Sequence, residues 1–397
     1  MHPARKRLLL MKRLCSTVFA AAVATLAGCD LHISTSSNSF GWSTSDLKSS
    51  TNITQSAAIP AGVKSLEVVN AFGSLKITGA DVDPAPGWSQ KLTVRAKTDA
   101  VVQQIASNFL CKSELIGDHL RLVVTAPNIS DPHSFQSDLE VTVPKSIIVQ
   151  TRNQYGQTEI QGMNGDVEAK AQFGAMELRD LAGKVRAETT YAAMKVGHTG
   201  PATLKNQFGA IEAADIHGPL EAETSYAPLK AHDISGTLKL RNQFGAIQAE
   251  KAWEADLKTS YAELNVKEIA GDARLVNQFG RVAAEDITGS VKAETSYGPM
   301  DIIGHGTNFV CDNQFGGISV RATSAKLANL EAHTSYAALK VRLPSSLKPT
   351  VQAHTSYGDI DSDFPVMMKS HPQDLSSDGA PRVNLRNQNG NIRVVSE

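Results

Sequence analysis

The sequence predicts an all-β protein, a single-stranded parallel β-solenoid (β-helix) built from 18-residue units. The first observation is an aromatic residue, followed by Gly or Ala, that recurs at a nearly constant interval along the chain. These aromatics are Tyr155, Phe173, Tyr191, Phe208, Tyr226, Phe244, Tyr261, Phe279, Tyr297 and Phe315. The second is that the stretches between them alternate apolar and polar residues with a period of two, which is typical of strands. Since such short strands cannot each bury a face alone, stacked coils must share one core.

The units alternate in kind, which gives a 36-residue super-repeat. One type reads Asn-Gln-Phe-Gly, at 206–209, 242–245, 277–280 and 313–316. The other reads Thr-Ser-Tyr followed by Ala or Gly, at 224–227, 259–262, 295–298, 334–337 and 355–358. A coil formed by one unit would interleave the two types, whereas a coil formed by two units would stack like on like. We favour the larger coil, because identical side chains gain by stacking at the strand spacing of about 4.8 Å.

The alternation also predicts which side chains point inward. Four asparagines have inward parity and form a predicted structural ladder, in which each amide donates to the next: Asn206, Asn242, Asn277 and Asn313. Such a ladder would satisfy amides that are otherwise costly to bury. The same parity places Tyr191 inward, which argues against an Asn or Tyr array that binds ligand. The glycines that close the units are expected to supply positive φ at corners: Gly183, Gly200, Gly218, Gly236, Gly271 and Gly289.

Residues 1–28 have the features of a lipoprotein signal peptide. Five basic residues and no acidic ones precede a short apolar run, and either Met1 or Met11 fits as the start. The segment Leu26-Ala27-Gly28-Cys29 resembles the lipobox of bacterial lipoproteins, which implies that Cys29 is acylated. Asp30 resembles the sorting signal that retains some lipoproteins in the inner membrane. The alternative is an ordinary secretory signal with a cysteine at its cleavage site.

The charge balance agrees with a lipid anchor. The whole chain of 397 residues has a net charge of −1, and removal of residues 1–28 leaves 34 basic and 40 acidic residues, a net charge of −6. This balance excludes nucleic-acid binding through bulk basicity. Because the chain is mildly acidic, acyl chains rather than anionic headgroups must hold it to the membrane. We therefore expect a membrane-anchored envelope protein facing the periplasm or the exterior, with an envelope protein or glycan as partner and no nucleic acid.

The chain is expected to divide into five segments. The signal peptide, 1–28, precedes a lipid-anchored flexible tether, 29–58, which is rich in Ser, Thr and Asn. An N-terminal β segment, 59–150, contains a short capping helix that begins with Asp99 as its N-cap. The solenoid repeats fill 151–342, and C-terminal coils and a cap fill 343–397.

Candidates for chemistry are few. His333 and His354 both stand directly before a Thr-Ser-Tyr segment, so adjacent strands would bring them together as a weak candidate metal site. A solvated column of polar residues is the alternative. Cys111 and Cys311 lie too many coils apart for a disulfide, so we predict that both are unpaired and that Cys311 is buried.

We expect no cofactor and no catalytic residue. The chain lacks the sequence motifs of common enzyme classes, and its outward acids are spread evenly along the coils. The favoured function is a non-enzymatic scaffold or binding surface. The alternatives are a carbohydrate-active β-helix enzyme and a partner protein in envelope-stress sensing.

The order of segments resembles the bacterial DUF4097 family of adhesin-like β-strand repeat lipoproteins. The resemblance begins with the segment from Leu66 to Gly79 and continues with a short helix and the strand–turn–strand of 117–124. It ends with a strand at 139–145, the repeats, and a last motif at 389–394. The family implies a β-helical fold and an envelope location, with no established activity. This chain departs from the family in its Asn-Gln-Phe-Gly and Thr-Ser-Tyr repeats, so a shared ligand is not implied.

Overall fold

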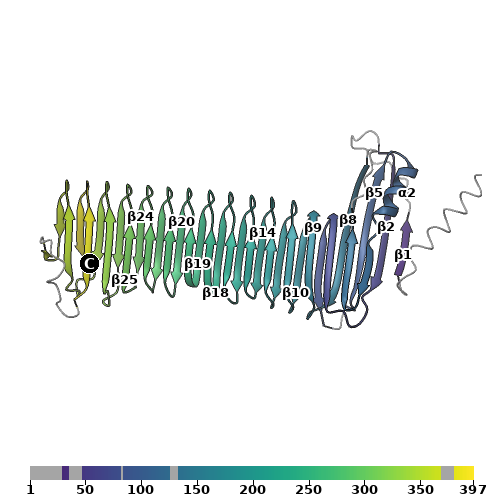
Figure 1. Ribbon diagram of the computed structural model, residues 1–397, viewed down its shortest axis with the longest axis horizontal. Coiled ribbons are helices and arrows are strands. Elements are labelled where there is room, and N and C mark those ends of the chain that lie inside the picture. Colours follow the sequence, from purple (N-terminus) through teal and green to yellow (C-terminus); the bar gives the residue numbers. More distant parts are fainter. Residues whose placement is uncertain (1–28, 35–46, 82–83, 126–132, 368–379) are drawn as a thin grey trace, which may run out of the picture. The chain divides into compact units, whose positions relative to one another are not determined.

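The computed structural model describes residues 29–34, 47–81, 84–125, 133–367 and 380–397. The signal-peptide prediction and the choice of start codon fall on residues 1–28, outside this part of the chain. The chain divides into two compact units, 1–147 and 148–397, each described here by itself (Figure 1). Within the described residues, no helix combines the length and apolar character needed to cross a membrane.

The first unit is a β structure with one helix. Its strands are β1 (Cys29–Ser34), β2 (Ser49–Ala58), β3 (Ser65–Phe72), β4 (Leu75–Ala80), β5 (Gly87–Ala96), β6 (Lys112–Ile116), β7 (His119–Val124) and β8 (His133–Pro144). Antiparallel pairing joins β1 to β2, β2 to β5 and β5 to β8, and parallel pairing joins β8 to β4. A second set pairs β6 antiparallel with β7 and β7 parallel with β3. Helix α2 (Asp99–Asn108) packs against β2 and β5 and buries Val102, Ile105 and Ala106.

Two predictions for this unit are wrong. The N-cap of α2 is Thr98 and not Asp99, because the extended Thr98 accepts a hydrogen bond from the Val101 amide through its hydroxyl. The predicted tether, 29–58, contains two strands, β1 and β2, and β2 pairs with β5 along its whole length. Residues 35–46 of the predicted tether lie outside the described residues. Within β2, Thr51, Ile53 and Ala57 are buried, so this polar segment presents alternate residues to the interior as a strand does.

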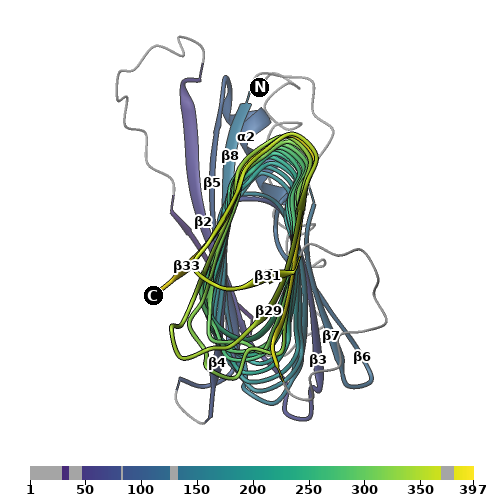
Figure 2. The same cartoon turned by 90° about the vertical axis from the view of Figure 1, so that its left-hand side faces the viewer.

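The second unit is a β-solenoid of flattened coils, each with two strands and two turns (Figure 2). The strands of one sheet, here called face 1, are β9 (Ile148–Tyr155), β11 (Val167–Ala171), β13 (Val185–Glu188), β15 (Ala202–Lys205), β17 (Leu220–Glu223), β21 (Ala273–Val276), β23 (Val291–Glu294), β25 (Asn308–Asp312), β27 (Asn329–Thr334), β29 (Thr350–Thr355), β31 (Val366–Met367) and β32 (Arg382–Asn387). The strands of the other sheet, face 2, are β10 (Thr158–Met163), β12 (Met176–Leu181), β14 (Met194–Thr199), β16 (Ile211–Ile216), β20 (Leu264–Ile269), β22 (Val282–Ile287), β24 (Met300–Gly304), β26 (Ile318–Ala322), β28 (Leu339–Leu343), β30 (Ile360–Ser362) and β33 (Ile392–Ser396). Two long strands, β18 (Leu229–Arg241) and β19 (Ile247–Lys258), run from face 2 into face 1 without a break.

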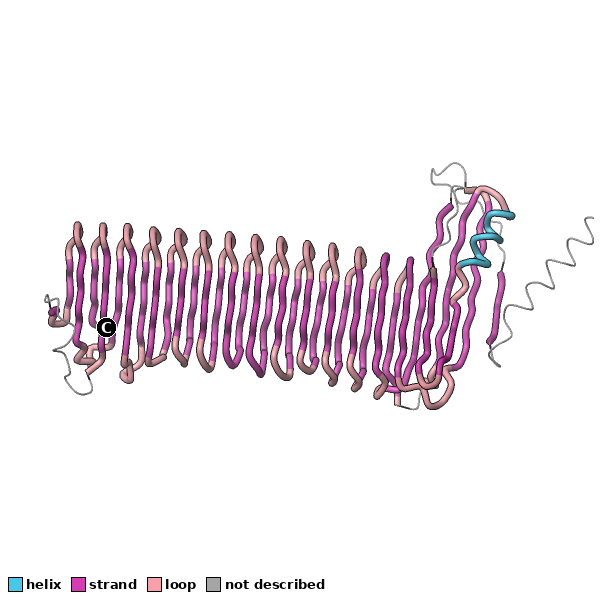
Figure 3. The backbone as a smooth tube through the Cα atoms, in the orientation of Figure 1, coloured by secondary structure: helices cyan, strands magenta, loops and turns pink. Residues whose placement is uncertain are grey.

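Each coil is formed by a single repeat unit, so the coil of two units that we favoured from the sequence is wrong. On face 1, Val167 pairs with Val185, and Val185 pairs with Ala202. Each coil therefore stacks in parallel register on a coil of the other repeat type, and the turns align along two edges of the unit (Figure 3). The core between the two faces consists of the inward residues of both, which are mostly small or branched apolar side chains. The repeat fixes this register, because a shift by one residue would exchange the inward and outward faces.

The corner glycines act differently from the prediction. Of the six, only Gly218 has a positive φ, 134°. At Gly183 a Cβ atom would lie 2.5 Å from the carbonyl oxygen of Gly165 in the preceding coil, so close approach of the coils requires glycine there. Positive φ occurs instead near the ends of the face-2 strand segments from β12 to β22, in a series of polar residues: Asp180, His198, Asp215, Asp233, Lys251, Glu268 and Asp286.

The last strands of the chain are inserted between earlier ones. On face 1, β32 pairs with β27 on one side and with β29 on the other. On face 2, β33 likewise lies between β28 and β30. The segments 334–337 and 355–358 are both of the Thr type, and the Asn-Gln-Asn-Gly segment 387–390 fills the coil between them. The alternation of Asn and Thr coils thus continues to the C-terminal end of the solenoid.

This insertion predicts slow hydrogen exchange close to the C-terminus. We expect the amides of Arg382–Asn387 to exchange as slowly as those of β27, because β32 is bonded on both sides. Mass spectrometry of exchanged peptides would measure this. Exchange as fast as that of a frayed terminus would contradict the insertion of β32 between β27 and β29.

Candidate binding surface

The turns that join face 1 to face 2 are held by polar side chains inside the coil. Asn206 accepts hydrogen bonds at Oδ1 from the amides of Gln207 (2.8 Å) and Gly209 (3.1 Å) of its own turn. Its Nδ2 donates to the carbonyl oxygen of Ala192 in the preceding coil, at 2.8 Å. The side chain therefore shapes one turn and binds it to the turn before.

Four of the six Thr coils use the same acceptor position, whereas Oγ1 of Thr189 and Oγ1 of Thr295 have no hydrogen-bond partner. Thr224 Oγ1 donates to the carbonyl oxygen of Gly209, 3.2 Å away in the preceding coil. We call the side chains that make this contact the clip column: Asn206, Thr224, Asn242, Thr259, Asn277, Asn313, Thr334, Asn387 and Thr355. In an Asn coil the residue after the aromatic must be glycine, because a Cβ atom on Gly209 would clash with the Ala192 carbonyl oxygen.

The structure places the four predicted ladder asparagines inside the solenoid but not in contact with one another. Asn206, Asn242, Asn277 and Asn313 are 5–8% exposed. Each is separated from the next by a Thr coil, since every unit forms a coil of its own. The predicted donation from amide to amide is therefore wrong, and each amide donates to a backbone carbonyl instead.

The aromatic residues point outward, contrary to the predicted parity. In a turn such as 206–209, Asn206 is buried but Gln207 and Phe208 are both exposed, so the strand alternation stops at the asparagine. Eleven rings lie outside and form a column: Tyr155, Phe173, Tyr191, Phe208, Tyr226, Phe244, Tyr261, Phe279, Tyr297, Phe315 and Tyr336. The sequence contained the signal for this, because a four-residue turn has no reason to keep the period of a strand.

The rings of this column are stacked face to face. Adjacent centroids are 4.8–5.1 Å apart and adjacent planes are inclined by 1–13°. Each ring is still 38–55% exposed. The faces of the rings are covered by their neighbours, so the solvent meets ring edges and, on every second coil, a tyrosine hydroxyl.

The surface around the rings is almost free of charge. We define the aromatic edge as the eleven rings together with the residue before each ring and the two residues after it. These flanking residues are Gln, Ser or Thr before the ring and mostly Gly, Ala or Pro after it, and only Glu263 and Arg281 are charged. The opposite edge carries the polar residues with positive φ, such as Asp215 and Lys251. The two edges of the solenoid thus differ in chemistry.

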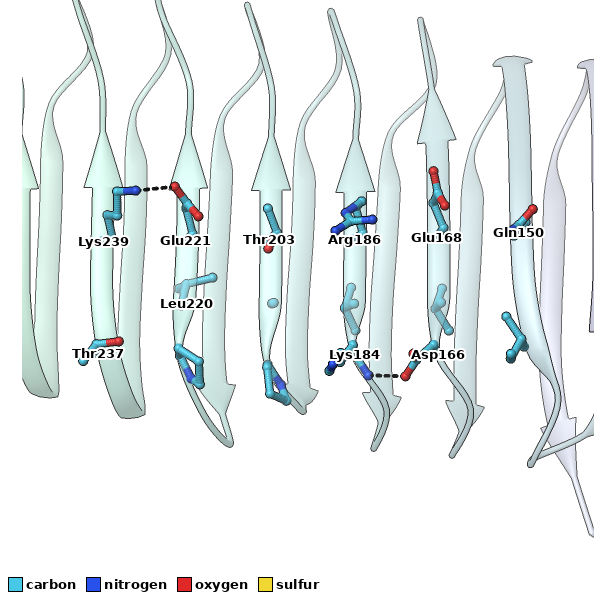
Figure 4. Close-up of a pocket in the computed structure, with 16 residues that line it drawn as sticks. Gln150, Asp166, Glu168, Lys184, Arg186, Thr203, Leu220, Glu221, Thr237 and Lys239 are labelled. Carbon is cyan, nitrogen blue, oxygen red and sulfur yellow. Dashed lines mark hydrogen bonds and ion pairs between the residues drawn. The ribbon is translucent and has the colours of Figure 1, made fainter.

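Face 1 carries a shallow depression of about 470 Å³ beside that charged edge (Figure 4). Figure 4 shows a row of outward side chains that includes Glu168, Arg186, Thr203, Glu221 and Lys239, and the short Thr203 side chain lies in its middle. Lys239 Nζ lies 2.6 Å from a Glu221 oxygen. This hydrogen bond lowers the pKa of Glu221, so the carboxylate stays ionised and is a poor proton donor near neutral pH.

The predicted histidine pair is not formed. Arg386 of β32 lies between His333 and His354 in the register of face 1, because the C-terminal strands are inserted there. His333 Nδ1 instead lies 3.1 Å from Asp312 Oδ1 on the preceding coil. Across the described ranges, no group of three or more His, Cys, Asp or Glu side chains is arranged to hold a metal ion.

The remaining predicted residues fall in different places. Cys29 and Asp30 are the first two residues of β1, and nothing in their backbone pairing with β2 tests lipidation or sorting. Neither Cys111 nor Cys311 forms a disulfide, as predicted, and Cys311 is buried, as predicted. Cys111 is buried as well. Burial, with a smaller contribution from Asp312, raises the pKa of Cys311 to about 12, so its thiol is inert at neutral pH.

The clip column gives a prediction for stability. The substitution Asn242→Ala removes the side chain that hydrogen-bonds the Ala227 carbonyl and the amides of Gln243 and Gly245. We expect the free energy of unfolding, measured by urea titration, to fall by about 2–4 kcal/mol. The matched control is Gln243→Ala, an exposed neighbour, which should change it by less than about 0.5 kcal/mol. Equal effects of the two substitutions would contradict the role of the clip column.

Comparisons with known proteins give a likeness in solved structures only. No protein-family model and no curated protein matches the chain. A candidate adhesin from Bacteroides fragilis is 14% identical, with 66% of this chain and 96% of that chain covered and a TM-score of 0.30. A candidate cell adhesion protein from Clostridium sporogenes is 10% identical, with 87% of this chain and 99% of that chain covered and a TM-score of 0.18. Identities and TM-scores this low support no inference about function.

Proposed function

We propose that this protein is a non-enzymatic lipoprotein of the bacterial cell envelope that acts as an adhesin-like scaffold or binding surface. The observation that carries the proposal is the aromatic edge, an exposed and nearly uncharged surface that runs through eleven coils. Monomeric proteins rarely leave long apolar surfaces in water unless these surfaces contact a partner. The resemblance of the segment order to the DUF4097 family supports the same envelope role.

The rigidity of the second unit supports display rather than catalysis. Strand pairing joins successive coils throughout, and the clip column and ring stacking reinforce most of these junctions, so the surface is preformed and presents similar groups at regular intervals. On face 1 several acids pair with cations on neighbouring strands, as Glu221 does with Lys239 and Glu188 does with Lys170. A general acid would need a carboxyl group whose pKa is raised, and Glu221 has the opposite shift.

Membrane attachment is proposed to depend on Cys29. We expect the whole chain, expressed in a bacterium that processes lipoproteins, to fractionate with membranes, and the variant Cys29→Ser to fractionate with soluble envelope proteins, because it lacks the acyl acceptor. The control Asp30→Ser should keep the protein on a membrane while changing which membrane holds it in a density gradient. Membrane attachment of the Cys29→Ser variant would contradict the lipid anchor.

The binding role is tested by crosslinking the anchored protein in its own host and identifying the products by mass spectrometry. The proposal predicts recovery of a specific envelope component whose crosslinks fall on the aromatic edge. Crosslinks that are scattered over both faces and over many abundant proteins would contradict it. Shortening of a purified envelope glycan by the protein would favour the alternative of a carbohydrate-active enzyme.

A further inference from the structure

The aromatic edge is large enough to form a stable protein interface. Phe and Tyr side chains bury roughly 150–250 Å² when covered, so eleven rings that are 38–55% exposed offer on the order of 1,000 Å². The share of one partner in a standard interface is about 800 Å². The edge is also enriched in aromatic residues and depleted of charge, as the centres of protein interfaces are.

The stacking of the rings limits what can bind there. A sugar ring or a flat aromatic ligand packs best against an open ring face, and here each face inside the column is covered by the next ring at about 5 Å. The column therefore offers a straight ridge of ring edges, with one ring edge per coil. A partner that fits along the whole ridge must be straight and must have the same spacing.

A second copy of this chain meets both requirements. Its ridge has the same spacing, and beside each ridge runs a strip formed by the two residues after each ring. Most of these side chains are short, such as Ala193, Ala210 and Pro228, and the long ones are Gln157, Glu263 and Arg281. A two-fold rotation about an axis parallel to the solenoid places the ridge of each copy over the strip of the other. The absence of like charges along most of the edge removes the main electrostatic obstacle to self-association.

We propose that two copies of this protein pair through their aromatic edges, with their solenoid axes parallel and a two-fold axis between them. Parallel axes keep the N-terminal coils of both second units at the same end, which is compatible with two lipid anchors in one membrane. This inference rests on the proposed function only in taking the aromatic edge to be the binding surface, and it names a second copy as the partner.

Sedimentation equilibrium of the soluble Cys29→Ser chain tests the pairing. We expect a monomer–dimer equilibrium, and the variant Ala193→Glu should raise its dissociation constant at least tenfold, because each dimer would bury two new carboxylates. Ala193 is exposed and lies beside the rings, so the substitution leaves the ring stack and the clip column intact. The matched control is Ala182→Glu, an exposed alanine in the turn at the opposite edge, which should leave the dissociation constant unchanged.

Site-specific crosslinking tests the direction of the axes. Ala175→Cys and Ala338→Cys introduce exposed thiols beside the first and last parts of the ridge, while the native Cys111 and Cys311 are buried. With a short bifunctional maleimide, each variant alone should give crosslinked dimers. A mixture of the two variants should give few dimers that join one variant to the other. Crosslinks only between Ala175→Cys and Ala338→Cys would indicate antiparallel copies and overturn the arrangement.

The outcomes separate this inference from the proposed function. A chain that stays monomeric at all concentrations overturns the dimer. If the same monomer still crosslinks a specific envelope component through its aromatic edge in the host, the proposed function stands and the edge serves a different partner.

Discussion

The second unit depends on one constraint, the parallel in-register stacking of coils that each contain a single repeat unit. In most coils, this register brings the carbonyl group after the aromatic residue within reach of an Asn or Thr side chain from the next coil. It also brings successive rings to about 5 Å from one another, outside the coil. The core, the clip column and the aromatic edge are therefore three results of a single repeat length.

The alternation of Asn and Thr coils explains the arrangement of the C-terminus. Two Thr coils in succession, at 334–337 and 355–358, leave a place for an Asn coil between them. The segment 387–390 fills this place, and Asn387 makes the clip contact with the Ala337 carbonyl at 2.7 Å. The sequence alone shows that the repeat is interrupted after Tyr336. It does not show that the C-terminal strands insert between earlier ones, because sequence spacing does not reveal which strand edge a later segment will join.

The sequence predicted the fold class and the buried asparagines, because strand alternation and repeat length follow directly from residue order. It failed where the period of a strand was extended into a turn. Parity predicts that Tyr191 lies inside, yet the strand ends at Glu188 and the turn that follows brings the ring out. The preference for stacking like on like also failed, because Asn206 finds better partners in backbone carbonyl and amide groups than in another amide. The outward position of the rings, and with it the aromatic edge, was therefore missed, although the sequence identifies every ring of the repeat and places each ring in a turn.

One measurement tests both the outward position of the aromatic column and the pairing of two copies through it. This measurement is nitration of tyrosine over a range of protein concentrations, followed by peptide mass spectrometry. We expect Tyr191, Tyr226, Tyr261 and Tyr297 to react readily in dilute protein and to become protected together as the concentration rises. Tyrosines that do not react at any concentration would contradict their outward position, and reactivity that does not change with concentration would contradict the pairing.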